Sequence, residues 1–234
     1  MITVTAQRRS ENIQDIPIAV TAIQADTAAL LGVDAPDALV QLVPSIALNR
    51  SSQGLVPFIR GVGTNSSTIG NEPSVAMYID DVYVPSGSAG IFSFNNIEAI
   101  EVLRGPQGTL FGRNATGGVI HIRTRRPSYE TDIRATATYA NYDTLQGQLY
   151  FSTGLSDNVA ISLAAYGQDQ GDGWGINIID GTDIYATDSW GVRGRLLVEF
   201  SEDTELLLNA SYDWRRGDVG GVGGAVAAEG TISM

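Results

Sequence analysis

Residues 97–123 read Ile-Glu-Ala-Ile-Glu-Val-Leu-Arg-Gly-Pro-Gln-Gly-Thr-Leu-Phe-Gly-Arg-Asn-Ala-Thr-Gly-Gly-Val-Ile-His-Ile-Arg, and this stretch decides the fold. It opens with an apolar run of β-forming residues that ends at Gly105-Pro106, because Pro106 has no amide hydrogen for a strand ladder. A second apolar run begins at Val119. The loop between the runs must turn tightly or admit other backbone at close range, since it contains Gly108, Gly112, Gly117 and Gly118. The stretch therefore predicts a strand, an irregular loop and a strand.

The same stretch resembles the signature of the plug domain of TonB-dependent outer-membrane receptors. That family carries a Val-x-Arg-Gly-Pro run, a Leu-Phe-Gly step, a Gly-Gly-Val-Ile run and a Thr-Arg-x-Pro exit. The four elements occur here in order and spacing, at Val102–Pro106, Leu110–Gly112, Gly117–Ile120 and Thr124–Pro127. Further upstream, residues 57–61 are similar to the first Arg-Gly element of the family. The resemblance covers the chain from about Ile2 to at least Pro127.

Two phosphate-binding loops are excluded by their residues. A P-loop needs a lysine after its second glycine, and this chain has no lysine. Gly61-Val62-Gly63 lacks the third glycine of a dinucleotide fingerprint, because Ser66 occupies that position.

Composition offers no catalytic or metal-binding constellation. Cysteine is absent, which excludes disulfides and cysteine-based zinc sites. The one histidine, His121, lies in a predicted strand and is interpreted as structural. Asp80 and Asp81 are adjacent in a predicted tight turn, where aspartate is favoured and neighbouring side chains point apart. We therefore expect no enzyme, no cofactor and no metal site.

The charge is acidic and unevenly distributed. All 14 basic residues are arginine, against 26 acidic residues, which argues against a nucleic-acid partner. Residues 1–126 hold nine arginines and ten acidic residues, whereas residues 127–234 hold five arginines and sixteen acidic residues. This difference predicts two structural units. No apolar run reaches the roughly 18 residues of a membrane-spanning helix, and no signal peptide precedes Ile2, which in this family implies a removed leader.

Residues 13–126 are predicted to form a compact α+β domain. Its elements are a strand at residues 16–23, short helices capped by Asp26 and Asp34, and a hairpin around Asp80-Asp81. Three segments rich in small and polar residues are predicted loops: Asn49–Gly54, Asn65–Asn71 and Val84–Ile91.

Residues 127–234 alternate apolar and polar side chains with a period of two. In residues 145–155, for example, leucines and Phe151 oppose glutamines, Tyr150 and Ser152. Strands of about ten residues with one apolar face are typical of a transmembrane β-barrel, although a soluble β-sandwich with one solvated face has the same pattern. The resemblance favours antiparallel barrel strands. About five strands are recognisable, against roughly 22 in plugged transporters, so the barrel is expected to be incomplete, and the last residues are interpreted as a loop.

Connection lengths predict an orientation. The turns at residues 155–158 and 201–204 are short, while residues 168–187 and the segment from Gly217 are long and rich in glycine and aspartate. Outer-membrane barrels have short periplasmic turns and longer extracellular loops. We therefore expect the first strand to rise from the periplasm and the long connections to face the outside of the cell.

The resemblance also implies the site residues. Residues 1–12 resemble the TonB box, which pairs with the energy transducer by strand addition; a frayed terminus is the alternative. The positions involved are Ile2, Thr3, Val4, Thr5 and Ala6. Arg60 and Arg104 are implied to pair with glutamates of the barrel wall, because guanidinium engages carboxylates bidentately. Those glutamates are expected on later strands, outside residues 127–234.

Ligand-binding candidates are polar residues of the predicted apical loops: Arg50, Gln53, Asn65, Ser67 and Ser86. The family implies a monomeric receptor in the bacterial outer membrane that imports a scarce solute, here most simply a ferric siderophore, with TonB-ExbB-ExbD as energy source and outer-membrane lipid around it. Cobalamin and glycans stay open as ligands. A TonB-dependent signal-transducing receptor and a soluble β-rich binding module stay open as functions.

Overall fold

The structure, a computed structural model, describes residues 3–4, 11–12, 18–24, 40, 42–51, 54–64, 73–84, 96–217 and 226–233. The chain divides into two compact units. The first unit comprises Met1–Phe92 and Ile97–Arg125, and the second comprises Ser93–Asn96 and Arg126–Met234. The main boundary coincides with the change in charge along the sequence. In the described part of the chain, no helix is long and apolar enough to cross a membrane.

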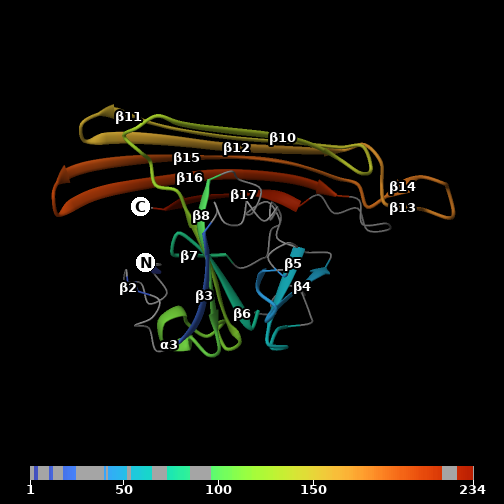
Figure 1. Ribbon diagram of the computed structural model, residues 1–234. Helices are drawn as coiled ribbons and strands as arrows, with labels where there is room; N and C mark the ends of the chain where they lie inside the picture. Colours follow the sequence, from blue (N-terminus) through green and yellow to red (C-terminus); the bar gives the residue numbers. More distant parts are fainter. Residues whose placement is uncertain are drawn as a thin grey trace. The chain divides into compact units, whose positions relative to one another are not determined.

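A mixed five-stranded sheet forms the centre of the first unit (Figure 1). The strand order is β3-β8-β9-β6-β7, in which β6 and β9 are parallel and all other neighbours are antiparallel. The bounds are β3 (Ala19–Gln24), β6 (Val75–Ile79), β7 (Val82–Val84), β8 (Ile97–Arg104) and β9 (Gly118–Thr124). Both runs of the signature stretch are therefore strands, and they pair with each other. The predicted hairpin around Asp80-Asp81 is also present, as β6 and β7.

Two strand pairs lie outside this sheet. They are β1 (Thr3–Val4) with β2 (Glu11–Asn12), and β4 (Ile46–Ser51) with β5 (Gly54–Ile59). The prediction of a loop at residues 49–54 is wrong, because residues 49–51 continue β4. The predicted helices capped by Asp26 and Asp34 lie outside the described residues, except for Val40 and Leu42, which are helical.

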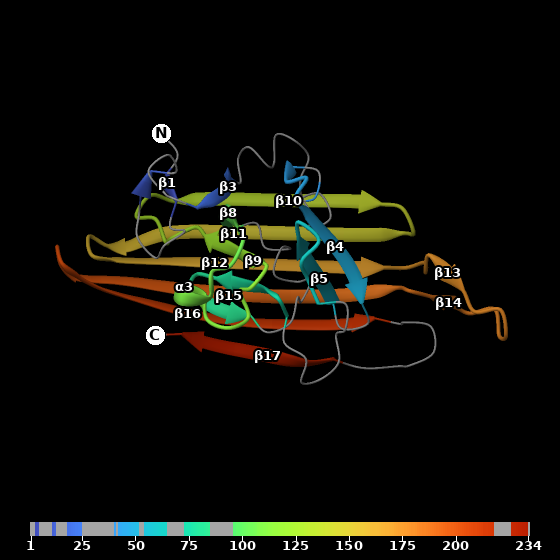
Figure 2. The same cartoon turned by 90° about the horizontal axis from the view of Figure 1, so that it is seen from below.

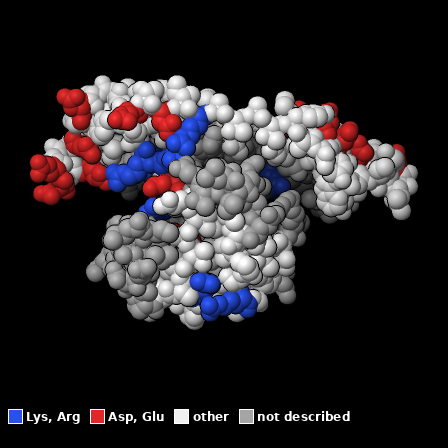
Figure 3. All heavy atoms as spheres, viewed as in Figure 1, with Lys and Arg blue, Asp and Glu red and all other residues white. Residues whose placement is uncertain are grey.

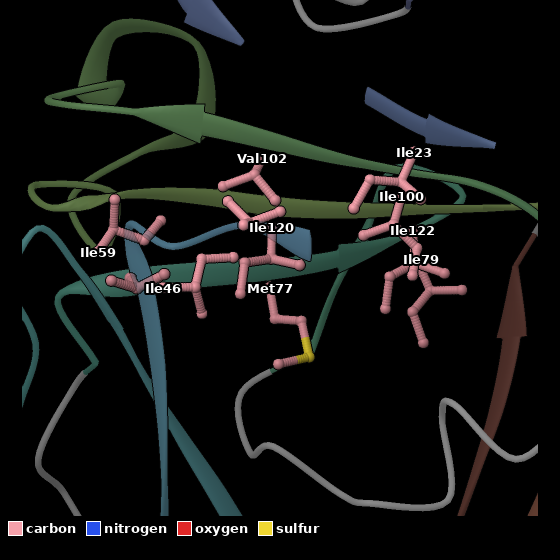
Figure 4. Close-up of a cluster of buried hydrophobic side chains, with 11 residues drawn as sticks. Ile23, Ile46, Ile59, Met77, Ile79, Ile100, Val102, Ile120 and Ile122 are labelled. Carbon is pink, nitrogen blue, oxygen red and sulfur yellow. The ribbon is translucent and has the colours of Figure 1, made fainter. Parts of the chain in front are cut away.

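The core of the first unit packs on both faces of the sheet. One face carries the larger cluster (Figure 4): Ile23, Val43, Ile46, Ile59, Val75, Met77, Ile79, Ile100, Val102, Ile120 and Ile122. The other face carries Ala76, Tyr78, Leu103, Phe111, Ala115 and Val119. Neighbouring residues of a strand point to opposite faces, so Val102 and Leu103 serve different clusters. A central strand covered on both faces reads as a continuous apolar run, which explains the sequence of β6 and β9.

The loop of the signature stretch contains one helical turn that the sequence did not predict. This helix, α3 (Gly108–Phe111), begins after Gln107 and ends at Gly112. Phe111 is buried, and its carbonyl accepts a 2.7 Å hydrogen bond from the Tyr78 hydroxyl. Burial of Phe111 against Tyr78 stabilises a turn too short to be stable by itself.

An antiparallel sheet forms the second unit, in the order β10-β11-β12-β15-β16-β17 (Figure 2). The bounds are β10 (Asp132–Ala140), β11 (Thr144–Ser156), β12 (Val159–Gln170), β15 (Thr187–Ser201), β16 (Thr204–Gly217) and β17 (Val226–Ser233). The connection from β12 to β15, predicted as a loop, contains the small hairpin β13 (Gly175–Ile176) and β14 (Asp183–Ile184). The prediction of about five strands omitted β17, because its residues are mostly small and show no alternation of large apolar side chains.

The two faces of this sheet differ in chemistry. Large apolar side chains are exposed on one face: Ile133, Tyr139, Leu145, Leu149, Leu155, Leu163, Trp190, Val192, Phe200 and Tyr212. On the opposite face, polar and small side chains are buried, among them Ser152, Ser162, Arg193 and Arg195. The strand register keeps each set together across neighbouring strands. The alternation expected from the sequence is confirmed.

Acidic side chains gather at the two ends of the same sheet (Figure 3). Asp157, Glu202 and Asp203 lie in the short turns at one end, and Asp172 and Asp180 lie in the long connection at the other. The exposed large apolar side chains of the strands lie between these two ends. An apolar belt between two charged rims is the pattern that lipid requires of a membrane wall.

Replacing Leu163 by arginine is expected to destabilise the sheet in a bilayer strongly. Leu163 lies near the middle of β12 on the exposed apolar face, where a charge costs about 2–4 kcal/mol. Leu155 lies on the same face beside the turn, and L155R is expected to cost only about 0–1 kcal/mol. The free energy of unfolding of the full-length protein from lipid vesicles measures both. Equal costs for the two variants would contradict a lipid-facing belt.

Candidate functional site

The two Arg-Gly elements and the Gly-Gly-Val-Ile run meet at Gly117 and Gly118, at the start of β9, and we name this glycine pair the glycine junction. Gly118 has a φ of +146°, and a Cβ there would overlap the carbonyl oxygen of Leu103 and lie 2.8 Å from Cδ1 of Ile59. A Cβ on Gly117 would lie 2.9 Å from Cγ1 of Val62. Only glycine leaves room for these neighbours. The Gly-Gly pair therefore allows both Arg-Gly elements to approach the same place.

Arg60 is presented by a tight turn after β5. The amides and carbonyls of Ile59 and Val62 bond reciprocally at 2.9 Å. Arg60 and Gly61 between them have φ values of 53° and 79°, as in the two-residue turns that join strands. The Arg60 amide also donates to the Ser45 carbonyl at 2.7 Å. The backbone is thus fixed, and the exposed side chain extends from it.

Arg104 is the last residue of β8 and pairs across the sheet with Ala19 and Gly118. Its Nε donates to the Ala19 carbonyl at 3.4 Å, and the side chain is half-buried. The strand then ends, because Gly105 has a φ of 94° and its amide turns to the Gly117 carbonyl at 3.2 Å. Arg104 therefore connects β8 to β3, the edge strand nearest the N-terminus.

The residues before the two arginines both adjoin Gly118, Ile59 through its Cδ1 and Leu103 through its carbonyl oxygen. Neither guanidinium makes an ion pair within the residues that the structure describes. Their expected pairing with glutamates of later strands stays a prediction. The structure brings Ile59 and Leu103, the residues before the two arginines, to the same glycine, which the sequence alone did not indicate.

The other predicted site residues are only partly described. Thr3 and Val4 form β1 and pair with Asn12 and Glu11. The positions Ile2, Thr5 and Ala6 lie outside the described residues. Among the ligand candidates, Arg50 lies in β4 rather than in a loop, and its side chain is not described. The remaining candidates, Gln53, Asn65, Ser67 and Ser86, lie outside the described residues, and all five stay predictions.

A buried polar cluster crosses the centre of the first unit. His121 is buried in β9, with Nδ1 at 3.6 Å from Glu101 and Nε2 at 3.6 Å from Asp81. Glu101 is fully buried and also lies 3.8 Å from Nε of Arg123. Asp80 accepts hydrogen bonds from the amide and hydroxyl of Thr124 at 2.8 Å and 2.6 Å. These contacts agree with a structural role for His121 and for the aspartate turn.

Two arginines on the polar face of the second unit were not predicted as buried. Arg193 and Arg195 lie on β15 and pair with Ala164 and Ser162 of β12. Both are below 7 % exposed. The small side chains of Ala164 and Ser162 leave space beside the long arginines. Long side chains of one strand opposite small side chains of its neighbour are the sequence pattern that could have predicted these buried arginines. On the same face, the Tyr166 hydroxyl donates to Asp213 at 3.1 Å.

Comparison with known proteins gives the same assignment for both units. A family model described as TonB-dependent Receptor Plug Domain matches residues 12–119. The Pesticin receptor of Yersinia pestis is 27% identical over 183 residues, which cover 78% of this chain and 27% of the receptor. The Vitamin B12 transporter BtuB of Vibrio vulnificus is 24% identical over 217 residues, or 89% of this chain and 34% of the transporter. The chain thus spans about a quarter to a third of the length of these relatives.

Solved structures show the same fold. The ferric yersiniabactin uptake receptor FyuA from Yersinia pestis has a TM-score of 0.71 at 24% identity, covering 86% of this chain and 32% of that one. The pyoverdine outer membrane receptor FpvA from Pseudomonas aeruginosa, bound to pyoverdine, has a TM-score of 0.72 at 19% identity, covering 91% and 30%.

These alignments extend beyond the family model into the strands of the second unit. The glycine junction with its two arginines therefore belongs to a plug domain, and the sheet with an exposed apolar face belongs to a barrel wall that does not close within the described residues. Residues 12–119 therefore belong to the TonB-dependent receptor plug domain family, and the chain as a whole is similar to TonB-dependent receptors of the bacterial outer membrane, with the plug domain followed by antiparallel strands of an incomplete barrel.

Proposed function

We propose that this chain is part of an energy-coupled receptor that imports a ferric siderophore across the outer membrane into the periplasm. One observation carries the proposal: a plug whose two Arg-Gly elements adjoin the same glycine pair is continuous along the chain with a sheet that has a lipid-compatible face and a polar face. The names of the relatives support the ligand class, since they include a catecholate siderophore receptor of Escherichia coli and the yersiniabactin receptor.

The geometry suggests how the plug is held and released. Arg60 and Arg104 pair with carboxylates of the barrel wall and keep the plug in place. Within the described residues, strand β1 of the TonB-box-like segment is held by two residue pairs, so a strand of TonB can replace β2 as its partner at little cost. Force applied to β1 is transmitted along the chain to the edge strand β3 and so to the plug sheet. The plug is then displaced, and the ligand is imported.

The partners follow from the same proposal. TonB binds Ile2–Ala6 and, with ExbB and ExbD, supplies the energy. Outer-membrane lipid covers the apolar face, and the ligand contacts the apical candidates Arg50, Gln53, Asn65, Ser67 and Ser86. The receptor is a monomer, binds no nucleic acid and catalyses no reaction. It requires no cofactor or metal of its own, because the iron arrives already chelated.

Uptake of radioactive iron tests the proposal. Cells with and without the full-length gene receive ⁵⁵Fe as catecholate, hydroxamate and mixed-ligand siderophores, and labelled cobalamin in parallel. We expect at least one ferric chelate to enter only when both the receptor and TonB are present. If only labelled cobalamin were taken up, the ligand would be cobalamin and not a ferric siderophore. Identical uptake of every compound in cells lacking the receptor would overturn the transport function.

A further inference from the structure

Residues 126–131, which we name the anchor segment, cross the short-turn end of the sheet in the second unit. Two side chains of this segment reach strands far away in the sequence. Nη2 of Arg126 donates to Glu205 of β16 at 2.6 Å, and the Tyr129 hydroxyl donates to Glu199 of β15 at 2.6 Å. The acceptors lie 79 and 70 residues further along the chain. The segment is therefore held by both strands of a later hairpin.

The backbone of the anchor segment is held by β11, which is itself fixed to β12. The Ser128 amide donates to Oγ of Ser152 in β11 at 2.8 Å, and that hydroxyl donates onward to the Ile161 carbonyl in β12 at 3.0 Å. The Gly154 amide of β11 donates to the Tyr129 carbonyl at 3.1 Å. Three barrel strands, β11, β15 and β16, thus bond directly to these six residues, and β12 fixes the Ser152 hydroxyl that receives the Ser128 amide.

Close approach and protonation state both favour this arrangement. A Cβ on Gly154 would lie 2.9 Å from the Tyr129 carbonyl oxygen, so glycine is required for the contact. Pro127 is buried. The hydrogen bond to Glu199, with smaller effects of burial and nearby acidic charge, raises the pKa of Tyr129 to about 12. Its hydroxyl consequently stays a hydrogen-bond donor throughout the physiological range.

We infer that the anchor segment is a fixed point of the transport cycle: a pull on the N-terminus displaces plug residues only up to Arg125 and leaves residues 126–131 on the barrel. Force reaches Arg126 only after it has passed along β9, whereas the anchor bonds are distributed over three strands. The inference uses the proposed function for the origin of the force alone. Its experiment needs neither a ligand nor import, so the two can fail separately.

Single-molecule pulling on the N-terminus of the full-length protein in a lipid bilayer tests the inference. Release of residues 1–125 frees about 450 Å of chain at roughly 3.6 Å per residue. A disulfide between S128C and S152C fixes the reference length, because the crosslinked anchor segment cannot open. The chain has no other cysteine, so this is the one disulfide that can form. We expect the uncrosslinked protein to stop at the same length as the oxidised crosslinked one. A longer release in the uncrosslinked protein would overturn the inference.

Matched glycine variants separate the anchor from general stability. G154A pushes a methyl group against the Tyr129 carbonyl, while G147A, in the same strand, meets nothing within 4 Å. In G154A we expect a several-fold larger fraction of traces to continue past the 450 Å stop at a given force. G147A is expected to match the unsubstituted protein. Equal fractions in all three proteins would show that these contacts do not hold the chain.

Discussion

Replacing Gly118 by alanine is expected to unfold the plug domain while the barrel strands stay folded. The added methyl group overlaps the carbonyl oxygen of Leu103 and lies 2.8 Å from Ile59. The carbonyl belongs to the paired strand β8, so it cannot move without breaking the sheet. Left-handed backbone adds strain for a residue with a side chain. Together the two effects cost roughly 3–5 kcal/mol, a large part of the stability of a domain.

Hydrogen exchange of the full-length protein in lipid measures this loss. Protection of the β8 and β9 amides is expected to fall by about two to three and a half orders of magnitude, with β11 and β12 unchanged. G108A is the matched control, because its methyl group meets nothing within 4 Å at the start of α3. It is expected to leave protection unchanged or slightly raised. Similar protection in G118A and G108A would mean that the glycine junction does not hold the plug together.

Replacing Val4 by proline is expected to abolish energised uptake with ligand binding intact. Recognition of β1 by strand addition depends on backbone hydrogen bonds, and proline has no amide hydrogen to donate. The missing bond and the clash of the ring together cost roughly 2–3 kcal/mol. That corresponds to a fall of about 30- to 150-fold in affinity for TonB.

Initial uptake rates and ligand dissociation constants in the same cells check this expectation. V4A is the control, because it keeps the backbone amide and is expected to retain most of the uptake. A normal rate in V4P would show that residues 2–6 are not the segment that TonB pulls. A V4P protein that also loses ligand binding would point instead to a folding defect.

The local pattern of the sequence predicted much of the fold. The apolar runs on either side of the signature loop became β8 and β9, and the period of two in residues 127–217 became antiparallel strands with one exposed apolar face. These features depend on neighbouring residues, which is why a single sequence reveals them. The helical turn α3 escaped prediction because burial of Phe111 against Tyr78 stabilises it, and that contact joins residues 33 positions apart.

The candidate site was less predictable, because it depends on contacts between distant segments. The sequence identified Arg60 and Arg104 through their motifs, but not that the residues before them, Ile59 and Leu103, adjoin Gly118. Similarly, the end of strand β4, residues 49–51, was predicted as a loop because Asn49, Arg50 and Ser51 are consecutive polar residues with no apolar alternation. Its partner β5 supplies the hydrogen bonds that make it a strand. The anchor segment had no sequence signal, since its acceptors lie about 70 to 80 residues away.

Lipid contact along β11 tests most directly whether the second unit is a barrel wall rather than part of a soluble β-module. Because the chain has no cysteine, single cysteines at positions 145 to 149 of the full-length protein take one fluorescent label each, and lipid-bound spin labels act as quenchers. Strong quenching is expected at Leu145, Gly147 and Leu149, and weak quenching at Gln146 and Gln148. Uniformly weak quenching, or the same quenching at all five positions, would contradict a membrane wall and with it the receptor function.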